Sequence, residues 1–237
     1  MTKPTEILSV SDQIVEDILN SILQGEIKLG QKLPTETELA DEYGVSRPTI
    51  RNALTTLEKE HILRSKKGCQ GGWYVIDSNT SSVAKYLGRY MTLLLNSNQI
   101  TSKDLLEIRS MIEVKSCGLA ALRRTPEDLQ AIAAAIPVNY QNLSDYEYHS
   151  QDIKFHRRVA EATHNPLIIL TLNATSMAQE LYAMTNPAPE KRRQELNKSL
   201  LDIYQAIVKQ EVREAEEAMQ IHLQFFKQMS GNVSFKK

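Results

Sequence analysis

Hydrophobic residues near the N-terminus recur at the spacing of an amphipathic helix. This first helix is predicted to begin near Ser9 or Ser11 and to end at Gly25. Its apolar positions are Ile14, Val15, Ile18, Ile22 and Leu23. The segment from Lys28 to Pro34 then interrupts the pattern and is predicted to be a connector.

Two short helices joined by a tight turn are predicted next. Thr35 and Glu38 have the spacing of a capping box, which marks the start of the second helix. Gly44 is expected to end that helix, because glycine accepts the left-handed conformation of a sharp turn. Ser46 is expected to cap the third helix, whose apolar face is Ile50, Ala53, Leu54 and Leu57. The arrangement is that of a helix-turn-helix.

A β-hairpin is predicted to follow. Residues 62–64 and 73–76 are apolar enough for two short strands, and the basic, glycine-rich segment 65–72 separates them. A hairpin with such a tip is typical of the wing of a winged helix-turn-helix. Residues 1–76 are therefore predicted to form a domain of three helices and a small β-hairpin wing.

The remaining chain has helical periodicity throughout. The polar segment 77–82 is predicted to be a linker, and residues 83–237 are predicted to form an all-helical bundle of about six helices. Apolar stripes at helical spacing mark four of them, and two more are expected at about 188–209 and 211–229. The predicted fold class is mainly α, with two domains.

Composition and charge limit the possible functions. Of 237 residues, 41% are hydrophobic, and the net charge is −1, so any basic surface must be local. Residues 44–68 supply one: six Lys or Arg against two Glu give +4. Two cysteines without a CxxC pattern, and no signal peptide or long apolar run, predict a cytoplasmic protein without a membrane partner.

The start of the third helix is predicted to read DNA. Arg47 and Arg51 lie one turn apart, and an arginine fork matches two acceptors on guanine. Ser46 and Thr49 can donate to phosphates, and Lys66 and Lys67 on the wing can neutralise others. The alternative is a solvated face with scattered charges, but the turn, cap, basic face and wing occur together in the order that DNA reading needs.

These residues resemble a known family. The stretch QKLPTETELADEYGVSRPTIRNALTTLEKEHIL, followed by GCQGGWYV, is similar to the N-terminal domain of the GntR family of bacterial regulators. The resemblance implies that Arg47 and Arg51 contact bases, while Ser46, Thr49 and Gly68 approach the backbone of double-stranded DNA. The sequence departs from the family at Thr37, where many relatives have an arginine.

The helical region contains a candidate metal site. Asp152 and His156 are four residues apart and share one helix face, and His222 lies on another predicted helix beside apolar residues. One carboxylate and two imidazoles suit a divalent ion such as zinc or nickel, with positions left open for water or an effector. The alternative is a hydrogen-bonded pair with a structural histidine.

Arg109 is a second candidate, because it interrupts the apolar stripe of its helix. A buried arginine requires an anion. Glu113, one turn away, is one possible partner, and an effector carboxylate is the other.

Three segments of the helical region resemble the FCD effector domain of the FadR-like branch of the family. They are LLEIRSMIEVKSCGLAAL at 105–122, DIKFHRRVAEATHNPLI at 152–168 and AMQIHL at 218–223. The resemblance implies a small organic acid as effector and a further histidine ligand where this chain has Leu200. Asn173 and His149 are possible substitutes for that ligand.

The sequence thus predicts a homodimeric transcriptional regulator that binds a palindromic operator and is controlled by a small carboxylate effector. Two alternatives remain. One is a degenerate regulator without metal or effector, which Leu200 favours. The other is a metalloenzyme with a DNA-binding head, although Glu147 and Glu161, the carboxylates nearby in sequence, lie off the face of Asp152 and His156.

Overall fold

The computed structural model describes residues 8–68, 71–77, 79–183 and 190–230. The chain forms two compact units, of which the first ends at residue 78 and the second begins at Asn79. Within the described residues, no helix is long and apolar enough to cross a membrane.

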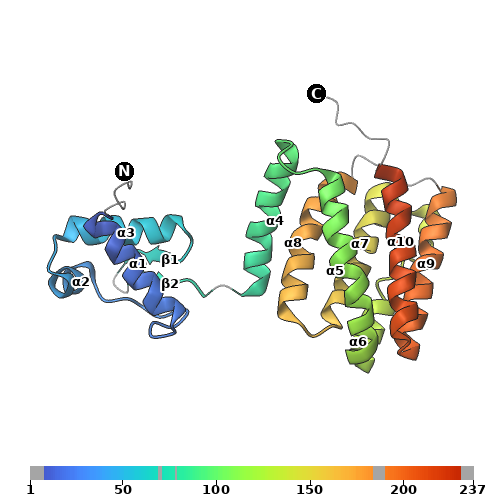
Figure 1. Cartoon of the computed structure of the whole chain (residues 1–237), viewed down its shortest axis with the longest axis horizontal. Helices are drawn as coiled ribbons and strands as arrows, with labels where there is room; N and C mark the ends of the chain where they lie inside the picture. Colours follow the sequence, from blue (N-terminus) through green and yellow to red (C-terminus); the bar gives the residue numbers. More distant parts are fainter. Residues whose placement is uncertain (1–7, 69–70, 78, 184–189, 231–237) are drawn as a thin grey trace, which may run out of the picture. The chain divides into compact units, whose positions relative to one another are not determined.

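The first unit is a winged helix-turn-helix (Figure 1). Its elements are α1 (Val10–Leu23), α2 (Glu36–Tyr43), α3 (Arg47–Lys59), β1 (Leu63–Lys66) and β2 (Gly72–Val75). The two strands are antiparallel, with Leu63 opposite Val75 and Lys66 opposite Gly72. Lys32, in the segment between α1 and α2, forms an isolated bridge to Tyr74.

The local signals in the sequence set these boundaries. Ser9 caps α1, and Thr35 and Glu38 form a capping box at the start of α2, as predicted. Gly44 ends α2 with φ of 65°, in the left-handed region. The three helices bury one apolar core with the base of the hairpin, formed by residues that include Ile18, Leu39, Ile50, Leu54, Leu57, Leu63 and Val75.

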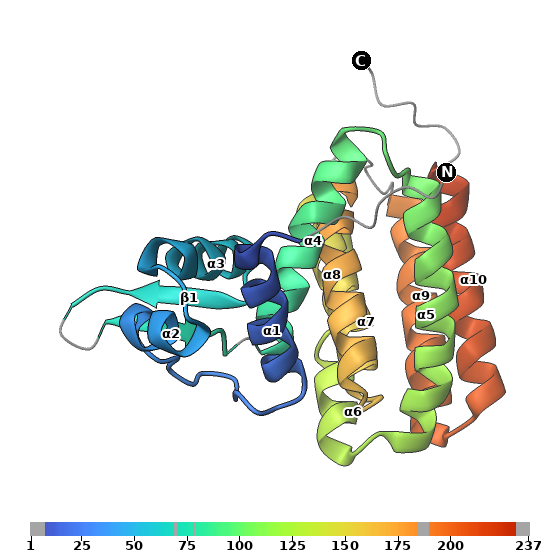
Figure 2. The same ribbon diagram turned by 60° about the vertical axis from the view of Figure 1, so that its left-hand side comes forward.

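The described part of the second unit consists of seven α-helices and one short 3-10 helix. They are α4 (Thr80–Asn96), α5 (Ser102–Arg123), α6 (Pro126–Ala133), η1 (Tyr140–Asn142), α7 (Asp145–Glu161), α8 (Pro166–Ala183), α9 (Glu190–Lys209) and α10 (Val212–Ser230). Helix α8 lies between α4 and α7, and α10 packs against α5 and α9 (Figure 2).

Helix α4 was missing from the sequence prediction of about six helices. It begins at Thr80, capped by Asn79, inside the segment expected to be a linker. Its apolar side chains are largely exposed: Val83, Tyr86, Leu87, Tyr90, Leu93 and Leu94. Few of them enter the core of this chain, which the sequence pattern could not show.

The main core of the bundle joins α5, α6, α7, α9 and α10. Its fully buried side chains include Phe155 and Leu200, with Ile203 and Ile207 on the same helix as Leu200. Polar groups are buried beside this core, among them Arg109, Glu113, Asp152, His156 and His222. Such buried groups need partners or a ligand, which marks this part of the bundle as a candidate functional site.

The conformation of Gly44 leads to a stability prediction. A Cβ at this position would meet no atom within 4 Å, so any cost of a side chain comes from the positive φ alone. Gly44→Ala should lower the free energy of unfolding of the first unit by about 1 kcal/mol. Urea unfolding followed by the fluorescence of Trp73, the single tryptophan of the chain, reports on this unit. Gly44→Asn should lose clearly less, and equal losses for both variants would show that the positive φ is not the cause.

Candidate functional site

The N-terminal turn of α3 is exposed and tightly capped. The Ser46 side chain accepts a hydrogen bond from the backbone N–H of Thr49 at 3.3 Å, and the two hydroxyl oxygens are 2.8 Å apart. Arg47 and Arg51 are exposed on the helix that follows. The structure thus brings all four predicted DNA-reading residues of α3 to one accessible helix end.

Arg51 is held in place by an acidic residue of the preceding helix. Its guanidinium donates to the Glu36 carboxylate from Nε at 3.1 Å and from Nη2 at 2.6 Å. Glu36 also accepts from the Trp73 indole at 3.3 Å. The hydrogen bond from Arg51 holds the pKa of Glu36 below its usual value, with burial opposing and Trp73 assisting. The role of Glu36 was not apparent from the sequence, because its partners Arg51 and Trp73 are distant along the chain.

The predicted wing residues lie at the exposed end of the hairpin. Lys66 and Lys67 are exposed, and the Lys66 ammonium lies 4.4 Å from the centre of the Tyr74 ring. Gly68 has φ of 102°, a conformation that favours glycine at the tip. Cys69 and Gln70 follow outside the described residues. Thr37, the position at which the sequence departs from the family, is exposed on α2.

In the second unit, three predicted ligands come together in the interior. Asp152 and His156 project from α7, and His222 projects from α10; all three are buried. The Nε2 atoms of His156 and His222 are 3.1 Å apart. They lie 3.6 Å and 3.5 Å, respectively, from the two carboxylate oxygens of Asp152.

The hydrogen bonds of His222 fix which of its nitrogens can bind a cation. The Ser199 hydroxyl donates to the Leu196 carbonyl at 2.6 Å, so its oxygen accepts from Nδ1 of His222 at 2.8 Å. With the proton on Nδ1, the lone pair is on Nε2, the atom that faces Asp152. The role of Ser199 was not apparent from the sequence, since nothing near it along the chain pairs it with His222.

Glu113 contacts Nδ1 of His156, as Ser199 contacts Nδ1 of His222. Its carboxylate is in ion-pair contact with Nδ1 of His156 and with Nε of Arg109, and all three side chains are buried. A carboxylate on the far nitrogen of a ligating histidine orients the ring and increases its basicity. Of the two possible partners of Arg109, Glu113 and an effector carboxylate, the structure has Glu113.

The oxygens of Asp152 provide the test of whether a metal fits. Both are buried, and neither accepts a hydrogen bond from any described residue. Once His156 loses the proton on Nε2, four acceptor atoms converge: two carboxylate oxygens and two Nε2 lone pairs. Zinc bound tetrahedrally by ligands at about 2.0–2.1 Å holds them about 3.3 Å apart, close to the separations of 3.1–3.6 Å seen here. The residues fit a divalent ion.

The electrostatics of the cluster agree with this donor set. Burial raises the pKa of Asp152, but the imidazoles of His156 and His222 hold it below its usual range. Burial lowers the pKa of His156, and the carboxylates of Glu113 and Asp152 raise it to about 9. Without an ion, His156 therefore holds a proton between two carboxylates. A bound cation replaces such a proton when it takes the same nitrogen.

Three other residues can be placed relative to the cluster. Leu200 is fully buried in the apolar core of the bundle and offers no ligand atom. His149 is buried on α7, one turn before Asp152, and Asn173 lies on α8 at the edge of a different cavity. Among the described residues, the group close enough to share an ion consists of Asp152, His156 and His222.

A winged helix-turn-helix and a helical bundle with a buried polar cluster define a two-domain DNA-binding regulator. Comparisons support this class. The model described as bacterial regulatory proteins, gntR family, matches residues 10–75, and the FCD domain model matches residues 104–225. The chain therefore belongs to the GntR family of bacterial regulators and contains an FCD domain.

Curated relatives agree with the family. The chain is 27% identical to the Glc operon transcriptional activator of Escherichia coli (strain K12) over 239 residues, covering 96% of this chain and 91% of the relative. It is 30% identical to the HTH-type transcriptional regulator LutR of Bacillus subtilis (strain 168) over 208 residues, covering 85% and 92%. These relatives are regulators and not enzymes, which confirms the prediction that the chain is not an enzyme.

Two more relatives match part of the chain, and one solved structure matches most of it. Relatives from Escherichia coli (strain K12) and Shigella flexneri, named for an L-lactate dehydrogenase operon, are 30% identical over 163 residues. The match spans 69% of this chain but 62% of their length. A solved structure, Streptococcus agalactiae GntR, has a TM-score of 0.60 at 24% identity, covering 92% of this chain and 99% of that one, and shows the same fold.

The Arg109–Glu113 pair yields a stability prediction. Glu113→Ala leaves a buried guanidinium without its carboxylate, which should cost about 3–5 kcal/mol. Lys115→Ala is the matched control, because Lys115 is on the same helix and its ion pair with Glu216 is exposed; it should cost less than about 1 kcal/mol. Urea unfolding of EDTA-treated protein, followed by circular dichroism at 222 nm, measures both. Equal costs would show that the buried pair has no special role.

Proposed function

We propose that this protein is a homodimeric transcriptional regulator whose affinity for a palindromic operator is set by a small organic acid bound in the helical domain. A divalent ion, zinc or nickel, would be held by Asp152, His156 and His222. The observation that supports the metal is the convergence of four buried atoms: two imidazole nitrogens and two Asp152 oxygens that have no hydrogen bond.

In this proposal the bound ion and the Arg109 side chain each contact the effector. A bound ion supplies a positive charge that accepts a carboxylate or hydroxyl oxygen at its open positions. Arg109 supplies a second point for the carboxylate. Because Glu113 contacts both Arg109 and His156, it can remain paired with His156 when the effector takes Arg109. Relatives named for an L-lactate dehydrogenase operon agree with a small hydroxy acid as a first candidate.

The same proposal assigns the DNA contacts. Arg47 and Arg51 are proposed to read base edges in the major groove, with Arg51 aligned by Glu36. Ser46, Thr49 and the wing residues Lys66, Lys67 and Gly68 are proposed to contact the phosphate backbone. In a dimer, two such helices would read the two halves of a palindrome.

The degenerate regulator without a metal is the alternative that a specific observation favours. Leu200 removes a ligand that the family resemblance implies, and it is buried in the apolar core. In that case His156 would keep its proton and would pair permanently with Glu113 and Asp152. Metal analysis of the purified protein separates the two possibilities.

For DNA reading, we expect Arg47→Ala and Arg51→Ala each to abolish sequence-specific binding. Loss of a bidentate contact to guanine costs about 1–3 kcal/mol of discrimination against other bases. The operator is first selected from random DNA with the wild-type protein, and affinities are then measured by gel shift. Lys59→Ala, at the far end of α3, is the control. Unchanged operator affinity in both arginine variants would refute the assignment.

For the metal, we expect wild-type protein to contain zinc or nickel by mass spectrometry and to gain thermal stability when either is added. Asp152→Asn and His222→Ala should lose both properties, whereas His164→Gln, which changes an exposed histidine, should retain them. Ser199→Ala keeps all three ligands and should weaken metal binding by about 10–100-fold. Wild-type protein with no metal and no thermal shift would leave the degenerate regulator as the function.

The effector is tested through operator affinity. If a small hydroxy acid such as L-lactate acts through the bound ion, it should change the operator Kd of the wild type and not that of Asp152→Asn. Binding linkage also requires that operator DNA change the affinity for the acid by the same factor.

A further inference from the structure

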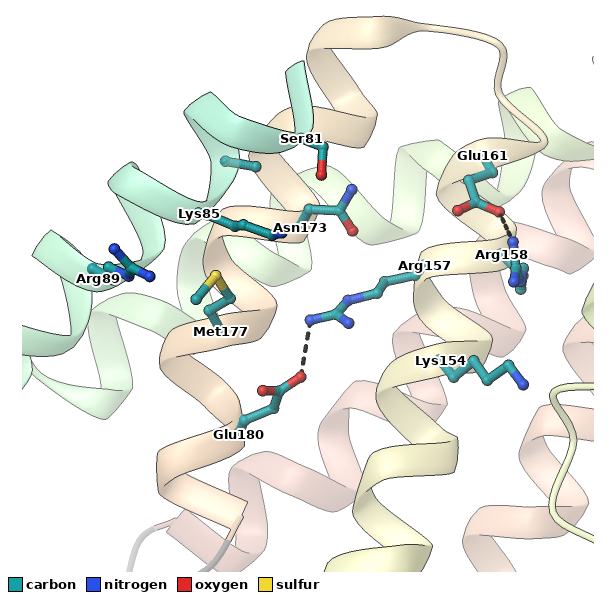
Figure 3. A pocket seen from close by; sticks show the side chains of 11 residues that line it. Ser81, Lys85, Arg89, Lys154, Arg157, Arg158, Glu161, Asn173, Met177 and Glu180 are labelled. Carbon is teal, nitrogen blue, oxygen red and sulfur yellow. Dashed lines mark hydrogen bonds and ion pairs between the residues drawn. The ribbon is translucent and has the colours of Figure 1, made fainter. Parts of the chain in front are cut away.

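A cavity lies on the outside of the bundle, and its lining does not include Asp152, His156 or His222. It has a volume of about 620 Å³ and is lined by α4, α7 and α8 (Figure 3). Five of its residues are cations, from α4 and α7: Lys85, Arg89, Lys154, Arg157 and Arg158. Two are anions, Glu161 and Glu180. We call this place the basic cavity.

The carboxylates of the basic cavity are already paired. Glu161 accepts from Arg158 at 2.5 Å, and Glu180 accepts from Arg157 at 2.9 Å. Within the part of the chain that the structure describes, no carboxylate forms an ion pair with Lys85, Arg89 or Lys154. The basic cavity therefore has a net positive charge of three that its own lining does not neutralise.

Arg157 gives an independent indication of a ligand. It extends from α7 toward Glu180 on α8, and Lys85 extends from α4 over α8 toward the same space (Figure 3). Nη2 of Arg157 is bonded to Glu180, but Nε is buried and donates to no described residue. An unused buried donor on a guanidinium is a cost unless an acceptor binds there.

The basic cavity is separate from the Asp152, His156 and His222 cluster. At 100° per residue, Lys154, Arg157 and Arg158 lie on the side of α7 away from Asp152 and His156. The metal ligands face the interior, whereas Arg157 and Arg158 are part-exposed. A molecule in the basic cavity would not compete for the buried cluster.

We infer that the basic cavity binds a small polyanion, a metabolite-sized compound with at least two phosphate or carboxylate groups. Its volume is in the range of small-molecule sites, which is about 300–1,000 Å³. Arginine forks match phosphate and carboxylate oxygens, and Lys85 adds a point charge from the opposite helix. Asn173 and Ser81 supply neutral hydrogen-bonding groups at its edge.

Such a ligand would tie α4 to the rest of the bundle. The two helices α4 and α8 are already close, since a Cβ on Gly88 would lie 2.8 Å from Cβ of Met177, a residue of the cavity lining. Helix α4 begins at Thr80, directly after the DNA-binding unit ends at residue 78. A polyanion that bridges α4 and α7 therefore acts on the helix through which the bundle is joined to that unit, and this gives it a route to operator affinity.

The test measures binding of fructose 1,6-bisphosphate and inorganic phosphate by isothermal titration calorimetry, with neutral fructose as a blank. We expect the bisphosphate to bind more tightly than phosphate and fructose not to bind. The double variant Lys85→Gln, Arg89→Gln should weaken binding at least about tenfold, because it removes two charged contacts. The single variant Arg157→Gln should weaken it as well.

Two control variants distinguish the basic cavity from general surface charge and from the buried metal ligands. The double variant Lys198→Gln, Arg213→Gln removes the same charge from α9 and α10 and should bind like the wild type. Asp152→Asn should also bind like the wild type, so a failure of the metal proposal leaves this result intact. Three outcomes would overturn the inference: no bisphosphate binding, equal loss in the α9/α10 control, or loss confined to Asp152→Asn. Weakened DNA binding without bisphosphate binding would assign the cations to nucleic acid instead.

Discussion

The buried contact between Glu113 and its two cationic neighbours, Arg109 and His156, is the interaction on which the helical domain depends. Burial by itself raises the pKa of Glu113, but Arg109 and His156 lower it to about 2, so the carboxylate stays charged in the interior. That charge compensates Arg109 and orients the His156 ring toward Asp152 and His222. Apolar packing alone would stabilise these helices, but it would not place two imidazole nitrogens and a carboxylate around one point.

The two faces of α7 divide the domain into two chemical environments. One face supplies Asp152 and His156 to a dry interior, where acceptors without donors favour a cation. The other supplies Arg157 and Arg158 to the basic cavity, where cations in excess favour an anion. A single amphipathic helix can thus serve two sites of opposite charge, because residues one or two apart point to different sides.

The winged helix-turn-helix could be predicted almost completely, because its signals are local. Capping residues, Gly44 and the apolar face of α3 each act within a few positions of the chain. Helix α4 was not predicted, although apolar residues recur along it at helical spacing, and only the structure shows that most of them stay exposed. The candidate ligands Asp152 and His156 were visible as a helical pair, but Glu36, Ser199 and the contact of Glu113 with His156 depend on partners on other helices or far along the chain.

The sequence by itself determined the helices and wing of the DNA-binding unit, the residues at the start of α3 and the family of regulators to which the chain belongs. The sequence offered Glu113 as a possible partner of Arg109, but the tertiary structure alone decided that Glu113 also pairs with His156, that Leu200 enters the apolar core and that Ser199 is hydrogen-bonded to Nδ1 of His222. The physical reason is distance along the chain. Caps and turns are satisfied by neighbours, whereas a buried charge is satisfied by whatever the packing of distant helices brings within a few ångströms.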